Sequence, residues 1–124
     1  MGVPSKLLKA EFVLPIKITS KFSLNSIYSG NHWRTRQKQA GWIHQQVKFS
    51  LLGQKIPKVF FANPVLIEFY WNSRLDLDNH GYLAKLIIDG LKGYLIEDDT
   101  KKHVREIRHS YWPQNGVKIE VSEV

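Results

Sequence analysis

All five aspartates of the chain lie in one short stretch, and their carboxylates are the groups in this sequence best suited to bind a metal ion. They are Asp76, Asp78, Asp89, Asp98 and Asp99. With Glu97, this stretch holds six acids against Lys85 and Lys92, a net charge of −4, whereas the whole 124-residue chain carries +7. Two carboxylates about 4 Å apart repel each other by about 4 kcal/mol at an effective dielectric constant of about 20. A divalent cation offsets such repulsion and can also bridge the carboxylates to a phosphodiester.

Several other kinds of site are excluded by the residues present. The chain has no cysteine, which rules out thiolate catalysis, disulfides and cysteine-ligated zinc or iron–sulfur sites. Its five histidines include no i, i+4 pair of the kind that binds zinc on a helix. Asp76, Asp78 and Gly81 match part of a calcium-binding loop, but Ile87 stands where that loop requires a glutamate. The sequence also has no glycine-rich phosphate loop and no nucleophile elbow.

Each acid also has an alternative structural role. Asp76 and Asp78 follow a predicted strand, so their carboxylates point to the same side if the extended geometry continues. Asp78 or Asn79 is alternatively placed to cap the helix that follows. Asp98 and Asp99 lie beyond the other end of that helix, where they need a cation to offset the negative end of the helix dipole, or form an exposed turn.

Lys85 also has two alternative roles. It lies four residues before Asp89, so the two side chains can form an i, i+4 ion pair. It also lies about two helical turns after Asp78, from where it can reach a bound phosphate. The sequence leaves both roles open.

The elements that must position these residues can be predicted from the pattern of apolar side chains. Residues 10–18 predict a strand, in which Pro15 favours an edge position or a bulge. Residues 33–52 predict a helix that the next glycine stops, and residues 64–72 predict a second strand. The polar segment from Thr19 to Asn31 is expected to form a loop.

The second half of the chain predicts one more helix and two strands. The helix runs from residue 79 or 80 to residue 94, and the strands lie near 103–112 and 116–122. The turn Pro113–Gly116 is expected to join these strands as a hairpin. The order predicts an α/β (α+β) fold: a single domain over residues 1–124, with two main helices packed on a mixed β-sheet.

Three apolar sets are expected to face the core. They are Ala40, Ile43, Val47 and Leu51 on the first helix, Val65, Ile67, Phe69 and Trp71 on the strand, and Leu83, Leu86, Ile87 and Leu91 on the second helix.

The excess of basic residues favours a polyanionic partner such as nucleic acid. The candidates for phosphate contacts are Arg34, Arg36, Lys38, Arg74, Lys101 and Lys102, with Lys48, Arg105 and Arg108 as further ones. Trp33, Tyr82 and Trp112 either stack on unpaired bases or belong to the core. No apolar run approaches the ~20 residues of a membrane span, and the N-terminus has no secretory leader. We therefore expect a cytoplasmic protein without a membrane partner.

Several short segments together match a known pattern. They are Leu75–Asn79, Ala84–Leu91 and Ile96–Asp99, preceded by Ser23–Tyr28, His32, Trp33 and a basic helix. In these residues the chain resembles the RusA family of Holliday junction resolvases, found in bacteria and their prophages. The resemblance implies a homodimeric, Mg²⁺-dependent endonuclease, with Mn²⁺ as a substitute. Such an enzyme resolves four-way DNA junctions by phosphodiester hydrolysis during recombination and repair.

The resemblance also implies roles for individual residues. Asp76, Asp78 and Asp99 would bind the metal, with Asp98 adjacent, and Lys85 would be the lysine that activity requires. Some members place this lysine three residues after the asparagine, whereas Lys85 lies six residues after Asn79. The number of metal ions per site is left open. The alternative functions are a non-catalytic nucleic-acid-binding module and a metal-dependent ribonuclease.

Overall fold

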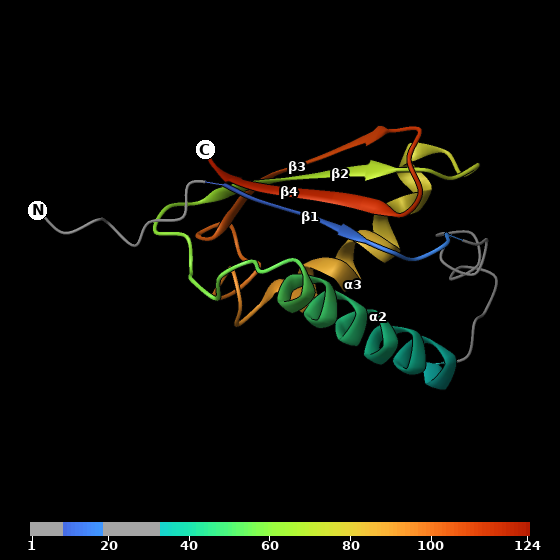
Figure 1. Cartoon of the computed structure of the whole chain (residues 1–124), viewed down its shortest axis with the longest axis horizontal. Coiled ribbons are helices and arrows are strands. Elements are labelled where there is room, and N and C mark those ends of the chain that lie inside the picture. The colour runs from blue at the N-terminus through green and yellow to red at the C-terminus, as the bar shows by residue number, and fades with distance from the viewer. Residues whose placement is uncertain (1–8, 19–32) are drawn as a thin grey trace, which may run out of the picture.

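The structure is a computed structural model that describes residues 9–18 and 33–124. Its elements are β1 (Lys9–Leu14), α2 (Trp33–Gly53), β2 (Val65–Trp71), the 3₁₀ helix η2 (Leu77–His80), α3 (Gly81–Leu91), β3 (Val104–Tyr111) and β4 (Val117–Glu123). Figure 1 shows the strands as one layer and the two α-helices as a second layer beside it. The predicted α+β domain with a mixed sheet and two helices is confirmed. The loop expected at residues 19–31 lies outside the described residues.

The four-stranded sheet has the order β1-β4-β2-β3, so β4 and β2 are its interior strands. β4 pairs antiparallel with both β1 and β2, whereas β2 pairs parallel with β3. Because β2 lies between β3 and β4, the predicted hairpin of β3 and β4 is wrong. β4 buries Val117, Ile119 and Val121, whereas most side chains of β3 are exposed. Placing β4 inside and the charged β3 at the edge therefore removes more apolar surface from water.

The connection from β3 to β4 crosses the end of β2. The Trp112 backbone N–H donates to the Trp71 carbonyl at 3.1 Å, and the Trp112 indole donates to the Gly116 carbonyl at 3.0 Å. Gly116 has a φ of +85°, and a Cβ there would lie 2.7 Å from the Leu14 carbonyl oxygen. Glycine therefore permits both the turn and its close passage beside β1.

β2 carries the predicted alternation. Its residues Val65, Ile67, Phe69 and Trp71 are fully buried in the core shared with the helices, while those between them are half-buried. One face of β2 therefore belongs to the core between the sheet and the helices. From the C-terminal end of β2 the chain continues to Asp76 and Asp78.

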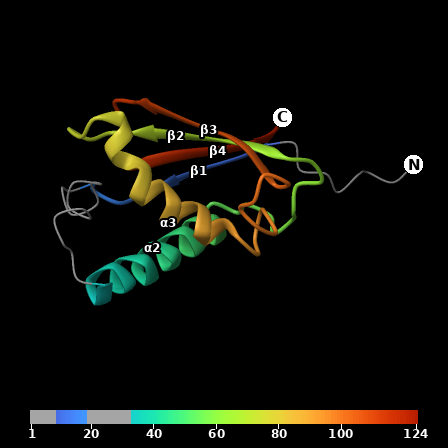
Figure 2. The ribbon, with the colours of Figure 1, turned by 180° about the vertical axis from the view of Figure 1, so that it is seen from behind.

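Both α-helices cover the same face of the sheet. They lie on the same side of it in Figure 1 and in the opposite view of Figure 2. The predicted apolar residues of α3 are buried, together with Ala84 and Ile88. A Cβ at Gly90 of α3 would lie 3.1 Å from the Cβ of Val47 on α2, so glycine allows the two helices to approach closely. No helix within the described ranges is long and apolar enough to cross a membrane.

Two predicted boundaries are wrong. β1 ends at Leu14 rather than residue 18, because Pro15 has no N–H to continue the ladder. α3 ends at Leu91 rather than Tyr94, where the chain leaves the helix and reaches Gly93 with a φ of +79°.

Candidate functional site

Asp76 and Asp78 lie at the N-terminal end of α3, in the turn that follows β2. Asp76 is extended, with φ −62° and ψ 152°, whereas Asp78 lies inside η2. The chain turns between them, so the expectation of one extended segment is wrong. Both residues are exposed, and within residues 9–18 and 33–124 neither carboxylate forms an ion pair.

The predicted capping of α3 by Asp78 or Asn79 is also wrong. The N-cap residue of α3 is His80, and no side-chain hydrogen bond closes that end. The reason is η2, whose 3₁₀ turn runs directly into α3 and places Asp78 two residues before the N-cap position. Its carboxylate therefore stays available.

His80 anchors this turn from inside the molecule. Its Nε2 lies 2.6 Å from Ser73 Oγ and its Nδ1 lies 3.1 Å from the Leu77 carbonyl oxygen. The imidazole stacks on Trp71 with the ring centroids 4.4 Å apart. Burial lowers the pKa of His80, against the raising effect of the Leu77 carbonyl and the Asp78 charge, so the ring is neutral at pH 7.

The other three aspartates gather around Lys92, just past the C-terminal end of α3. Lys92 Nζ lies 3.2 Å from Asp89 Oδ1, 3.3 Å from Asp99 Oδ2 and 3.7 Å from Asp98 Oδ1. The hydrogen bond to Asp89, with further help from Asp99, raises the pKa of Lys92. Partial burial acts to raise the pKa of Asp99, but its bonds to Asp98 and Lys92 outweigh this and lower it. The cation that the acids beyond the helix require is therefore Lys92.

Lys85 forms the predicted i, i+4 ion pair with Asp89. Its Nζ lies 3.2 Å from Asp89 Oδ2, and 68% of its side chain is exposed. Such a pair is weak, so it leaves Lys85 free to exchange Asp89 for an incoming phosphate.

A groove of about 450 Å³ runs between α3 and β3, and both Lys85 and Asp99 line it. Gly81, Ala84 and Ile88 form its helix side, and Val104, Ile107 and His109 form its strand side. His109 Nδ1 accepts a hydrogen bond from the Trp71 indole at 2.9 Å, which places the ring proton on Nε2. Burial, with a smaller effect of His80, lowers the pKa of His109.

The structure thus brings some predicted site residues together and separates others. Asp99 shares the groove with Lys85, whereas Asp76 and Asp78 lie at the opposite end of α3 from the Lys92 cluster, close in sequence to Gly81 of the groove. Within the part of the chain that the structure describes, no three acidic or histidine side chains come close enough to hold a metal ion. The donors are nevertheless hard carboxylate oxygens, and Mg²⁺, which keeps several waters, needs only one or two of them. Asp76 and Asp78 fit that requirement.

The predicted phosphate-binding residues lie in three places. Arg34, Arg36 and Lys38 are on the first turns of α2, Lys101 and Lys102 follow the acidic turn, and Arg74 precedes Asp76. All are exposed except Arg36, which is half-buried.

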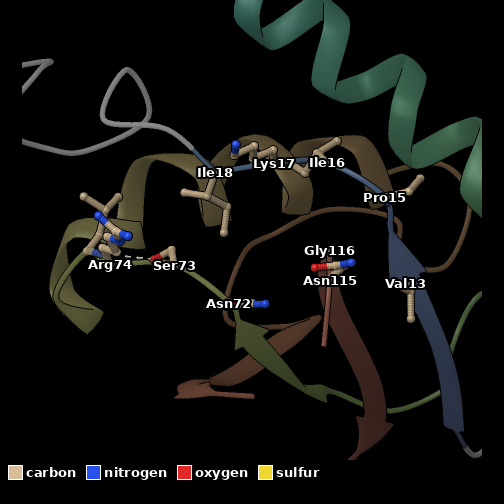
Figure 3. Close-up of a pocket in the computed structure, with 11 residues that line it drawn as sticks. Val13, Pro15, Ile16, Lys17, Ile18, Asn72, Ser73, Arg74, Asn115 and Gly116 are labelled. Carbon is tan, nitrogen blue, oxygen red and sulfur yellow. Dashed lines mark hydrogen bonds between the residues drawn. The ribbon is translucent and has the colours of Figure 1, made fainter. Parts of the chain in front are cut away.

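Arg74 borders a second, larger cavity of about 1,090 Å³ at the end of the sheet. Figure 3 shows Arg74 and Asn72 on the chain after β2, Lys17 on the chain after β1, and Asn115 on the β3–β4 connection. Two cations and two amides from segments far apart in sequence therefore border an open space, and Leu75, the residue before Asp76, also lines it. Such groups suit a phosphate and its neighbouring sugar or base.

The aromatic candidates for base stacking are already engaged. The Tyr82 hydroxyl donates to Gln39 Oε1 at 3.0 Å, and the Trp112 indole to the Gly116 carbonyl. Both side chains are half-buried. The side chain of Trp33 lies outside the described residues.

Sequence reasoning missed Lys92, His80, His109 and Lys17. A lysine three residues after Asp89 and six residues before Asp98 was a usable signal for Lys92. Lys17 and the histidines gave none, because their roles depend on strand order and on stacking against Trp71.

Comparison of the sequence with models of protein families and with curated proteins finds no match.

Proposed function

We propose that this protein is a Mg²⁺-dependent endonuclease that cuts branched DNA, four-way junctions above all, by hydrolysing phosphodiester bonds in recombination and repair. The observation that carries the proposal is the pair Asp76 and Asp78: two exposed carboxylates without an ion-pair partner in the described structure, in a chain of net charge +7. The N-terminal end of a helix stabilises a carboxylate by only about 0.3–1 kcal/mol, whereas carboxylate oxygens are the ligands that Mg²⁺ prefers. We further propose that the protein acts in the cytoplasm.

In this proposal Asp76 and Asp78 hold Mg²⁺, with Mn²⁺ as a substitute. Asp99, with Asp98 adjacent, would join them only on leaving Lys92, whose Nζ lies 3.3 Å from Asp99 Oδ2. When bound, Mg²⁺ polarises the phosphoryl group and lowers the pKa of a water molecule.

The remaining roles belong to the chain itself. Arg74 and Lys17, which line the cavity that also includes Leu75, the residue before Asp76, would bind the DNA backbone and hold a phosphate near the two carboxylates. Lys85 neutralises charge that develops on the phosphate. His80 holds the turn in place without adding a charge at pH 7.

The basic surface supplies affinity rather than sequence preference. Arg34, Arg36, Lys38, Lys101 and Lys102 are proposed to contact phosphates, which suits a substrate recognised by its branched shape. The affinity should fall with salt, with log K changing by about −0.9 per phosphate contacted for each unit of log salt.

The test is a cleavage assay on labelled four-way junction, linear duplex, single strand and a matched RNA junction, each with Mg²⁺, Mn²⁺ or EDTA. The proposal predicts nicking of the DNA junction with either metal and none with EDTA, while junction binding persists in EDTA. Binding without nicking in any metal would contradict it. Equal cleavage of the RNA junction would instead identify a ribonuclease.

A second function, a non-catalytic nucleic-acid-binding module, is favoured by one specific observation. Lys92 already pairs with Asp89, Asp98 and Asp99, so these acids have a structural cation and do not depend on a metal ion for one. Within the described residues Asp76 and Asp78 have no such ion pair, and the same assay separates the two functions.

A further inference from the structure

The outer face of α2 exposes large apolar side chains that the proposed site does not use. Trp42 is 44% exposed, Phe49 is 63% exposed and Leu52 is 55% exposed. The opposite face of the helix buries Ile43 and Val47 in the core. Figure 1 shows α2 at the border of the molecule opposite the sheet. Exposed apolar groups gathered on one face, unlike single scattered ones, mark a surface that binds something.

These side chains lie on one line along the helix. Lys38, Trp42, Gln45, Phe49 and Leu52 follow one another at intervals of four, three, four and three residues, and all five are exposed. Side chains at such intervals are neighbours on one face of an α-helix. Two helical turns separate Trp42 from Phe49, which is about 10 Å along the axis. The line therefore combines two aromatic rings with an amine and an amide.

The helix that carries this line has only positive charge. The basic residues of α2 are Arg34, Arg36, Lys38 and Lys48, and residues 12–67 contain no aspartate or glutamate at all. Lys38 and Lys48 are exposed, and within residues 9–18 and 33–124 neither forms an ion pair. The charge of this face is therefore complementary to an anionic partner.

A single strand of nucleic acid matches the aromatic groups as well as the charges. Its unpaired bases stack on aromatic rings, and its phosphates attract lysine. A duplex fits less well, because its bases lie inside the stack. The distance from Trp42 to Phe49 spans about three nucleotides at about 3.4 Å per nucleotide. Gln45 lies between the two rings, and its amide has both donors and an acceptor for a base edge.

Two other partners fit this face less well. The same spacing occurs where two helices pack against each other, but such a seam is apolar along its length, and Lys38 and Gln45 occupy two of the five positions here. A helix that lies in a membrane surface inserts its larger apolar face into lipid. The larger apolar face of α2 is already buried against α3 and β1.

The line begins close to the N-terminal end of α3. Gln39, the residue after Lys38, accepts a hydrogen bond from the Tyr82 hydroxyl at 3.0 Å. Tyr82 lies only four residues after Asp78. A strand that follows the line along α2 therefore leaves the helix beside the end of α3 that carries the exposed carboxylates.

We propose that the outer face of α2 binds single-stranded DNA, with unpaired bases stacked on Trp42 and Phe49 and phosphates held by Lys38 and Lys48. The choice of DNA over RNA rests on the proposed function, in which DNA is the substrate. The binding itself requires neither the aspartates nor a metal ion, so it can be tested apart from cleavage.

The first experiment measures the dissociation constant of a short labelled oligothymidylate by fluorescence anisotropy in EDTA, where the proposed nuclease is inactive. Trp42→Ala and Phe49→Ala should each raise this constant by about fivefold or more, because a base loses its stacking partner. Binding of a linear duplex should change less than about twofold, since its bases do not stack on the rings. Phe60→Ala removes an aromatic side chain that is 43% exposed outside α2, and this control should bind like the wild type.

Conservative variants separate stacking from general apolar contact. Trp42→Tyr and Phe49→Tyr keep an aromatic ring and should stay within about twofold of the wild-type dissociation constant. Trp42→Leu and Phe49→Leu keep an apolar side chain without a ring, and they should bind more weakly than the tyrosine variants. Stacking should also quench the emission of Trp42, so Trp42→Phe should bind the oligothymidylate and lose most of the quenching seen in the wild type.

The lysines are tested through the dependence of binding on salt. Lys38→Gln should reduce the slope of log K against log salt by about 0.7, the value for one phosphate contact of a single strand. Lys9→Gln is the matched control, because this lysine lies on β1 and pairs with Glu120. Its slope should equal that of the wild type.

Several results would overturn the proposal. One is wild-type affinity in both Trp42→Ala and Phe49→Ala, and another is equal affinity of the leucine and tyrosine variants. Tighter binding of an oligouridylate than of the oligothymidylate would assign the face to RNA. A wild-type dimer that Trp42→Ala dissociates in sedimentation would place a second copy there. Binding to phosphatidylserine vesicles that the same variant loses would assign the face to a membrane.

Failure of this proposal is distinguishable from failure of the proposed nuclease. Asp76→Asn should bind the oligothymidylate at least as well as the wild type, whatever its activity. Trp42→Ala should still nick a four-way junction in Mg²⁺ if the nuclease proposal is correct, because the ring lies outside the proposed metal site. Circular dichroism of each variant separates loss of binding from loss of the fold.

Discussion

The two ends of α3 both carry aspartates, but within the described residues only one end has an ion-pair partner for them. At the C-terminal end, Lys92 lies within 4 Å of Asp89, Asp98 and Asp99. At the N-terminal end, Asp76 and Asp78 are exposed and form no ion pair within the described residues. In the proposed function the two clusters therefore differ: Lys92 is the internal cation of one, while the other would take an external cation when an anionic backbone approaches.

The sharpest way to test this comparison is the same substitution at each end. Asp76→Asn or Asp78→Asn should lower Mg²⁺-dependent cleavage of a four-way junction by about 100-fold or more, because each removes a metal ligand. Junction binding in EDTA should be unchanged or tighter, since a repulsive charge is lost. Asp89→Asn, at the end that contains Lys92, is the control and should change cleavage less than about threefold. Full activity of both N-terminal variants would contradict the comparison.

Lys85 lies between the two ends and tests how far the functional region extends. Lys85→Met should reduce cleavage by about tenfold if the ammonium stabilises charge on the phosphate. Stability should fall by no more than about 0.5 kcal/mol, because the exposed pair with Asp89 is weak. Denaturant unfolding measures the second effect. Unchanged cleavage together with lower stability would show that Lys85 serves only the ion pairs of Asp89 around Lys92.

Removing the internal cation should make the two ends alike. Lys92→Met leaves Asp89, Asp98 and Asp99 facing one another, so the melting temperature should fall. Millimolar Mg²⁺ should then raise the melting temperature of the variant more than that of the wild type, because the ion binds the folded cluster. Lys58→Met, which removes a lysine from outside the cluster, is the control. An unchanged melting temperature in Lys92→Met would show that the cluster does not depend on its lysine.

The smallest expected effect is a pH dependence that belongs to the N-terminal end. Burial lowers the pKa of His80 and of His109 below 6.5, so the unfolded chain binds protons before the folded one. The contribution of these two histidines to the free energy of unfolding is therefore fully present above about pH 6.5. It declines as the pH falls through their pKa values in the folded protein. His109→Gln, which keeps an acceptor for the Trp71 indole, should reduce this slope in denaturant titrations. A slope equal to that of the wild type would remove His109 from the explanation.

The spacing of apolar residues predicted the helices and strands well, because it marks the face of each element that is buried in the core. The alternation in β2 and the stripe of α3 both mark side chains that the structure buries. Capping and strand ends were predicted less well. η2 displaced the helix start by one or two residues, and the buried His80 anchors this turn through Ser73.

The pairing of strands could not be predicted from adjacency in sequence. Residues 104–111 and 117–123 are joined by a short bend, which favours a hairpin. Their order in the sheet was instead decided by which strand gains more from a central position, a comparison that involves β1 and β2 as well.

The sequence by itself determined that the acids cluster, that the chain is basic around them, and that the main helices and strands occupy their predicted segments, because composition and periodicity are local properties. The tertiary structure decided which acids have a partner, since Lys92 meets Asp98 and Asp99 only when the chain folds back past the end of α3. It also decided that β3 is an edge strand among the described residues while Gln54 bonds to the backbone of β1, because both depend on contacts between residues far apart in the chain.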